Sequence, residues 1–207
     1  MKTPAFFDDV APIAVTDPLA ALLGAAESGR IEYRYLDAVK LAGHSCPTVA
    51  GAWLMTRTAL AHLYPDSSPQ RGGLRVELRQ AVGEGVTGVM ASVAGLITGA
   101  ANDGGFKGLG GRFERRGLLR FDVAMAGEIR FTRLDNRASV ELAHFPQSVP
   151  RPSGLVELMR QALAPHADAA TREAFAEAWQ DWVRLILIDH ADDPALITVE
   201  HSLVPAG

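Results

Sequence analysis

The residues best placed for chemistry lie in one short segment, Gly43-His44-Ser45-Cys46-Pro47-Thr48. Cys46 is the single cysteine of the chain, and His44 precedes it by two residues. A thiolate is both a nucleophile and a soft metal ligand, and a nearby imidazole can assist in either role. The segment therefore predicts either a metal centre or a nucleophilic cysteine.

A helix is expected to begin directly after Cys46. Pro47 suits the first helical position, because its φ is already helical and its missing N–H would find no partner there. An apolar run from Val49 to Leu54 follows, and the helix is predicted over residues 47–64. The positive end of the helix dipole and the free backbone N–H groups would stabilise a thiolate at Cys46.

Two ligands are too few for a zinc ion, which takes four in structural sites and three in catalytic ones. His44 and Cys46 could hold one ion from a tight turn, so a third ligand must come from elsewhere. His144 and His190 are candidates by residue type. His62 lies on the helix that starts after Cys46, about 24 Å along it, and cannot share the site within one protomer.

A second candidate site is the glycine-rich segment 99–111 with the basic residues beside it. Lys107 and Arg112, followed by Arg115 and Arg116, could hold an anionic ligand together with backbone N–H groups. The segment lacks the Gly-Lys-Ser/Thr ending of a P-loop, and it does not join a strand to a helix as a dinucleotide fingerprint does. The alternative is a solvated hairpin with tight glycine turns.

Trp179 and Trp182 lie three residues apart in an amphipathic pattern that also contains Phe175. This spacing favours packing in the core or at a dimer contact over an aromatic ligand cage.

The elements that must position these residues follow from hydrophobic periodicity. Strands are expected over residues 74–79, 119–125, 129–133, 138–142 and 195–199, and further helices over 18–23, 36–41, 86–98, 155–163 and 175–186. The three strands after residue 118 are expected to form a meander. Helices on one side of a sheet indicate an α+β fold. We expect an N-terminal arm of low order with a short helix over residues 1–30, an α+β core over 31–145 and a helical extension over 146–207.

The bulk composition narrows the class of protein. The chain has 207 residues, of which 48% are hydrophobic and 21% charged, with a formal net charge of −4. Because no stripe of Lys and Arg is visible, nucleic acid is not an expected partner. No run of about 18 apolar residues is present, so no membrane span is expected. A single cysteine and the absence of a signal-peptide pattern predict a cytoplasmic protein.

Gly43-His44-Ser45-Cys46-Pro47 resembles the Gly-His-x-Cys-Pro signature of the family formed by the E chain of formylmethanofuran dehydrogenase and its free-standing relatives. Downstream, residues 85–89, 96–99 and 106–108 resemble that family's Gly-Val-Asp-x-Ile, Leu-Thr-Gly and Gly-Lys-Gly segments, in the expected order. The similarity covers residues 33–143.

The resemblance implies a fold like the catalytic domain of glyceraldehyde-3-phosphate dehydrogenase, a bound metal that is commonly zinc, and a homodimer. It does not specify a reaction. The sequence departs from the pattern at Ala42, where the family often has a second histidine, and at Thr48, where it usually has glycine. A family cysteine falls near Glu84, which makes Glu84 the first candidate for the third metal ligand. The zinc-ribbon cysteines of some relatives are absent.

Three hypotheses about function follow, and they leave open whether the protein is an enzyme. The first is a zinc protein with His44, Cys46 and Glu84 as ligands and a small-molecule pocket between the Cys46 helix and the glycine-rich segment, where Lys107 and Arg112 would bind the ligand. The second is a non-catalytic accessory or ligand-binding module of a redox complex. The third is a metal-free enzyme in which Cys46 is the nucleophile and His44 its base.

Overall fold

The computed structural model describes residues 2–203. Its helices and strands form the α+β fold expected from the sequence. The helices are α1 (Pro18–Leu22), α2 (Tyr35–Ala42), α3 (Pro47–Leu63), α4 (Thr87–Thr98), α5 (Leu155–Ala162) and α6 (Ala169–Arg184). The strands are β1 (Ile13–Thr16), β2 (Arg30–Tyr33), β3 (Leu74–Leu78), β4 (Leu119–Arg120), β5 (Ile129–Arg133), β6 (Ser139–His144) and β7 (Ile197–Leu203). Short 3-10 helices lie at Ala5–Asp8, Glu27–Gly29 and Pro146–Ser148, and a π-helical turn spans Leu185–Asp189.

The main sheet has five strands in the order β4-β3-β5-β6-β7 and is mixed. All neighbours are antiparallel except β3 and β4, which are parallel. The expected meander is therefore wrong at its first strand, because β4 pairs with β3 and not with β5. The strand predicted over 119–125 is also shortened to two residues, since Asp122 adopts a left-handed φ of 57° that interrupts the extended backbone.

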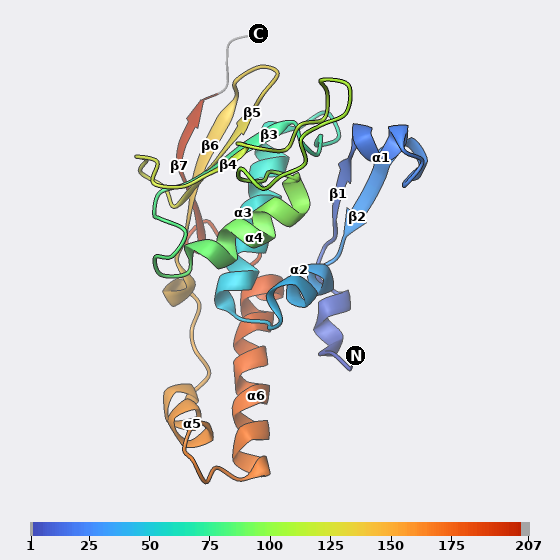
Figure 1. Cartoon of the computed structure of the whole chain (residues 1–207). Coiled ribbons are helices and arrows are strands. Elements are labelled where there is room, and N and C mark those ends of the chain that lie inside the picture. Colours follow the sequence, from blue (N-terminus) through green and yellow to red (C-terminus); the bar gives the residue numbers. More distant parts are fainter. Residues whose placement is uncertain (1, 204–207) are drawn as a thin grey trace.

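Helices α3 and α4 lie together on one face of this sheet (Figure 1). Apolar side chains on alternate residues of β3, β5 and β6 point toward them, and Leu74, Val76, Phe131 and Val140 are almost fully buried. Helix α3 is apolar on nearly every side, which explains why Trp53 is completely buried. This helix is the central element of the core, and it fixes the position of the segment that precedes it.

The N-terminal residues are more ordered than the sequence suggested. Ile13–Thr16 forms strand β1, which pairs antiparallel with β2, and the side chains of Phe7, Val10 and Val15 are buried in the core. The expectation of a loosely ordered arm was wrong, because these apolar side chains gain burial against the body of the protein.

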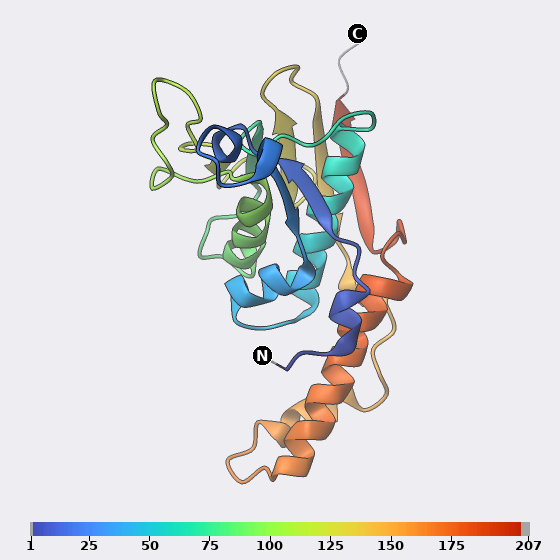
Figure 2. The same cartoon turned by 90° about the vertical axis from the view of Figure 1, so that its right-hand side faces the viewer.

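Helices α5 and α6 form a hairpin that extends away from the sheet (Figures 1 and 2). The C-terminal end of α6 packs against α3, whereas α5 packs mainly against α6. This hairpin is the expected helical extension, but the chain then returns to the sheet as its edge strand β7.

Gly51 in the middle of α3 makes room for the imidazole of His144 on β6. A Cβ atom at this position would lie 2.2 Å from the His144 ring. An alanine is favoured over glycine in a helix by about 1 kcal/mol, but overpacking a core costs about 1–3 kcal/mol. We therefore expect Gly51→Ala to lower the free energy of unfolding, measured by urea denaturation. In a His144→Ala background the same change should be neutral or stabilising; an unchanged loss there would exclude the ring as its cause.

Among the helices in residues 2–203, none combines the length and the apolar character that crossing a membrane requires.

Candidate functional site

Cys46 is the N-cap residue of α3, as the sequence predicts. Gly43 ends α2 with a φ of 78°, and the chain turns so that Cys46 is extended and Pro47 is the first helical residue. The backbone N–H of Val49 donates to the Cys46 sulfur at 3.5 Å. The thiol therefore takes the place that a serine or aspartate oxygen usually has at the start of a helix.

A pocket of about 440 Å³ opens beside Cys46. Its walls come from the start of α3, from α5 with the segment before it, and from α6, and the lining residues are Cys46, Pro47, Thr48, Arg151, Leu155, Val156, Met159, Trp179 and Trp182. The volume is in the range of small-molecule sites, and the walls consist mainly of carbon. The pocket is thus suited to an apolar ligand.

The polar atoms of the two tryptophans are taken up by hydrogen bonds within the protein. Trp179 donates its indole N–H to the Ser45 carbonyl at 3.1 Å, and Trp182 donates to the Val149 carbonyl at 3.3 Å. The rings meet edge to face with centroids 5.8 Å apart. The expectation that they serve only core or dimer packing was incomplete, because both rings also line the pocket.

The turn that carries Cys46 is fixed by polar contacts on its far side. The Ser45 hydroxyl lies 3.0 Å from the hydroxyl of Tyr35, a fully buried side chain. Burial raises the pKa of Tyr35, so this hydroxyl stays protonated and available for the hydrogen bond. The Gln180 side chain also donates to the Ser45 carbonyl, at 3.2 Å. Helix α6 is therefore tied directly to the residue before Cys46.

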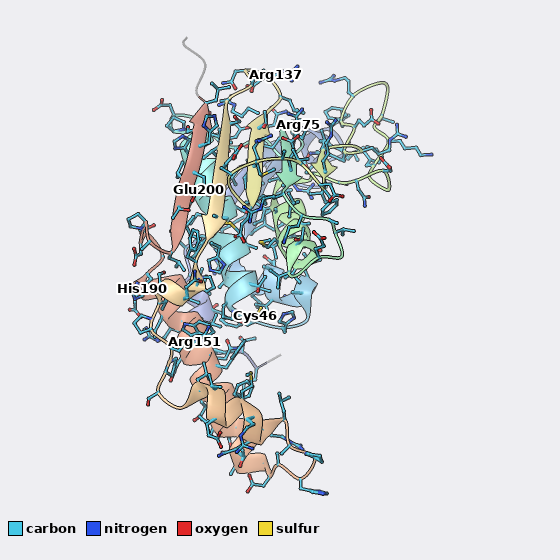
Figure 3. All side chains as sticks on the ribbon, turned by 90° about the vertical axis from the view of Figure 1, so that its left-hand side faces the viewer. Cys46, Arg75, Arg137, Arg151, His190 and Glu200 are labelled. Carbon is cyan, nitrogen blue, oxygen red and sulfur yellow. The ribbon has the colours of Figure 1, made fainter. Side chains whose placement is uncertain are left out.

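Arg151 supplies the single formal charge among the lining residues (Figure 3). Its guanidinium lies 5.0 Å from the centre of the Trp182 ring, in a cation–π arrangement. Arg151 forms no ion pair with residues 2–203, and it is free to meet an anionic group at the pocket mouth.

His44 does not line the pocket with Cys46. Its side chain is exposed, and its Nδ1 lies 2.9 Å from the carbonyl oxygen of Ala42. The hydrogen bond stays local to the turn, so the structure gives no direct contact between this imidazole and a ligand in the pocket.

Glu84 closes its own turn rather than joining His44 and Cys46. Its carboxylate accepts from the Ala81 N–H at 3.2 Å, and its backbone carbonyl accepts from Thr87. Across residues 2–203, no group of three or more His, Cys, Asp or Glu side chains is arranged to hold a metal ion. The ligand set that the resemblance implies does not assemble within this part of a single chain.

The other histidines have separate local roles. His62 lies 2.6 Å from the Ser202 hydroxyl, and His190 lies 3.0 Å from the Asp193 carboxylate. His144 is packed on Gly51, where burial lowers its pKa to about 4. An imidazole with such a pKa is neutral at pH 7.

The predicted anion-binding residues separate in the structure. Arg112 lines a polar cavity with Arg71 and Arg115, whereas Lys107 is exposed and is not among its lining residues. The segments that line this cavity, at the start of α1 and over residues 70–72 and 112–115, lie toward the C-terminal end of α3, opposite to Cys46 at its start (Figure 1). The glycine-rich segment does not line the pocket beside Cys46, so the expected pocket between the Cys46 helix and that segment stays a prediction.

Sequence reasoning missed the wall that α5 contributes. Leu155, Val156 and Met159 share one face of that short helix, and the amphipathic pattern alone did not show what they face. In the structure Val156 is 61% exposed, so this face is not simply core, and no sequence pattern predicts that exposure.

We compared the chain with protein-family models and with curated proteins. No family model and no curated protein matches it.

Proposed function

We propose that this protein binds a small apolar molecule with an acidic group, a medium-chain or aromatic carboxylic acid, in the pocket beside Cys46. The observation that carries the proposal is the 440 Å³ pocket that the single cysteine, one arginine and two tryptophans line together. This develops the ligand-binding alternative among the three hypotheses.

Each part of the wall has a chemical role in such binding. The apolar part of the ligand would lie on Leu155, Met159 and the tryptophan rings, where burial contributes about 25 cal/mol per Å² of apolar surface. Its carboxylate would meet the guanidinium of Arg151. The polarisable sulfur of Cys46 would contact the ligand at the helix terminus, where the dipole favours negative charge.

The geometry favours binding over thiol catalysis. A cysteine nucleophile needs a base within hydrogen-bond distance and a third group that orients the base. His44 is the predicted base, yet it is exposed, bonded to the Ala42 carbonyl and outside the pocket lining. The nucleophile hypothesis therefore has less support than the binding hypothesis.

Zinc binding stays a second candidate, because Cys46 is at the pocket wall and part of a turn that resembles the Gly-His-x-Cys-Pro signature of the formylmethanofuran dehydrogenase family. His44 and Cys46 would be two ligands, and the remaining ones are unassigned. Elemental analysis after zinc-supplemented expression tests this candidate, and less than about one ion per two chains contradicts it.

The homodimer is likewise a prediction, which light scattering on the purified protein tests.

Alkylation of Cys46 provides a direct test of the proposed binding. Iodoacetamide can modify one cysteine only, so intact mass spectrometry follows the reaction at this site. Octanoate at ten times its dissociation constant should slow alkylation by about tenfold, because only the free protein reacts. Arg151→Gln should weaken octanoate about threefold to fivefold, as expected for an exposed ion pair, while leaving 1-octanol unaffected.

A pair of variants distinguishes pocket occupancy from a general surface effect. Met159→Trp fills the pocket and should abolish protection by octanoate. Leu163→Trp places the same ring at the end of α5 on a side chain that is 76% exposed and outside the lining, and it should retain protection. Equal protection in both variants, or no protection in the parent, would refute the proposal.

A further inference from the structure

A second cavity, of about 450 Å³, lies at the other end of α3 and is lined by polar and charged groups. Three separate segments form it, and the lining residues are Pro18, Gln70, Arg71, Gly72, Arg112, Phe113, Glu114 and Arg115. Three arginines thus line one space, Arg71 from one segment and Arg112 and Arg115 from another that is distant in the sequence.

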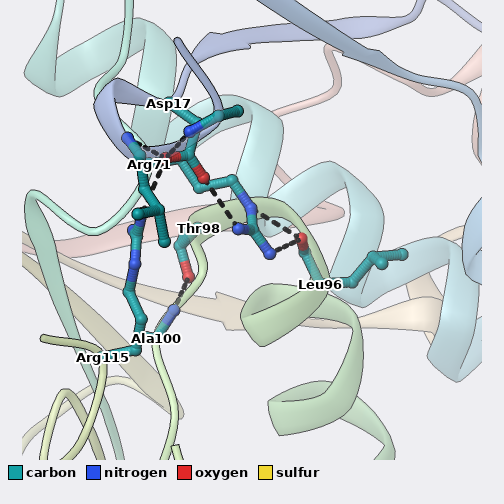
Figure 4. A network of polar contacts seen from close by, with 8 residues as sticks. Asp17, Arg71, Leu96, Thr98, Ala100 and Arg115 are labelled. Atoms are coloured by element: carbon teal, nitrogen blue, oxygen red, sulfur yellow. Dashed lines mark hydrogen bonds and ion pairs between the residues drawn. The ribbon is translucent and has the colours of Figure 1, made fainter. Parts of the chain in front are cut away.

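Two of these arginines share a single buried carboxylate (Figure 4). Arg71 donates to one oxygen of Asp17 at 3.0 Å, and Arg115 donates to the other oxygen at 2.8 Å. The side chains of Asp17 and Arg115 are only 4% and 7% exposed. The Asp17 Oδ1 also accepts from two N–H groups of α1, so four donors share this one carboxylate.

The charges around the cavity do not balance. One carboxylate faces two guanidinium groups, which leaves a net positive charge beside the buried Asp17–Arg115 pair. Arg71 is 24% exposed and also donates to the Leu96 carbonyl, an acceptor without a formal charge. Glu114 does not compensate for it, because Arg116 holds its carboxylate with a 2.7 Å hydrogen bond. Arg112 adds a third cation that forms no ion pair with residues 2–203, and the Arg115 Nη1 has no hydrogen-bond partner in that range. An anion would satisfy this excess charge.

The backbone is shaped to admit these groups. A Cβ atom on Gly72 would lie 1.6 Å from the Arg115 Nη1, so only glycine leaves room for the guanidinium there. Phe113 adopts a φ of 63°, which is unfavourable for a bulky side chain, and this conformation holds Arg112 and Glu114 on the cavity wall.

We propose that this cavity binds the phosphoryl group of a small phosphorylated molecule. Guanidinium forks match phosphate oxygens, and the dianion suits a site with more than one uncompensated cation. The space exceeds that of a phosphate alone, and it leaves room for an organic part beside Pro18 and Phe113. This site is separate from the Cys46 pocket and does not depend on the function proposed there.

Isothermal titration calorimetry at constant ionic strength tests the proposal with inorganic phosphate, glycerol 3-phosphate and acetate. Both phosphates should bind saturably at one site per chain, with glycerol 3-phosphate at least as tight, and acetate about tenfold weaker or undetectable. Tighter binding of inorganic phosphate than of the ester would overturn the assignment to a phosphorylated molecule.

Two exposed arginines give a matched pair of variants that should both fold. Arg112→Gln removes a guanidinium from the cavity wall and should weaken phosphate binding about tenfold, the usual loss for a hydrogen bond to a charged group. Arg120→Gln removes the same charge from a residue that is outside the lining and donates to the Gly117 carbonyl, and it should leave affinity within about twofold. Equal weakening by both variants, or no saturable heat in the parent, would overturn the proposal.

Discussion

Replacing Asp17 by asparagine is expected to lower the free energy of unfolding by about 3–5 kcal/mol, the usual loss when one partner of a buried ion pair is removed. Asparagine keeps the shape and the helix-capping ability of aspartate, so the change isolates the charge. It leaves Arg115, which is almost fully buried, without a counter-ion. Urea denaturation followed by circular dichroism measures the loss.

Asp168→Asn is the matched control for this change. Asp168 also caps a helix, accepting from the Thr171 N–H at 2.8 Å, but it is exposed and forms no ion pair in the described chain. Its replacement should alter stability by no more than about 0.5 kcal/mol. Comparable losses in both variants would mean that exchanging a capping carboxylate for an amide, and not the loss of a buried counter-ion, causes the effect at Asp17.

Acid is expected to destabilise the protein through His144. Burial lowers the pKa of His144 from 6.5 to about 4 in the folded state. Because the unfolded chain binds a proton that the folded chain excludes, this residue makes stability fall as the pH decreases through 6.5, until about pH 4. The contribution amounts to about 2 kcal/mol between pH 7 and pH 5, and about 3 kcal/mol over the whole window.

His144→Gln cannot titrate and should therefore lose less stability than the parent when the pH is lowered from 7 to 5. Urea denaturation at several pH values gives the difference between the two slopes. His166→Gln removes a histidine from an exposed loop and serves as the control, for which we expect the slope of the parent. A His144→Gln slope equal to that of the parent would show that His144 binds its proton equally well in both states.

Local signals predicted the elements around Cys46 well. The pair Cys46-Pro47 located the start of α3 because capping and the fixed φ of proline depend on neighbouring residues alone. The strand predicted over 119–125 failed for the opposite reason. Its alternating pattern was real, but the left-handed backbone of Asp122 and the choice of β3 as partner depend on contacts distant in sequence.

The difference between local signals and contacts distant in sequence also explains the outcome for the candidate sites. Cys46 and Arg112 were singled out from their own neighbourhoods, and each lines a cavity. Their partners Trp179 and Arg71 could not be assigned, because no local pattern links residues so far apart. Glu84 was chosen from the family resemblance and Lys107 from loop composition, and neither lies where the prediction put it. Sequence thus indicated single groups, and the tertiary fold determined which groups meet.

The distance along the chain between Cys46 and α6 has a consequence for biogenesis. During synthesis the thiol leaves the ribosome well before the tryptophans that cover it, because α6 lies near the C-terminal end of the sequence. Until the C-terminal hairpin arrives, the start of α3 presents an unshielded sulfur and apolar surface to oxidants and to other nascent chains. The emergence of α6 from the ribosome is therefore the event that protects Cys46, and chaperone occupancy of this surface should end there.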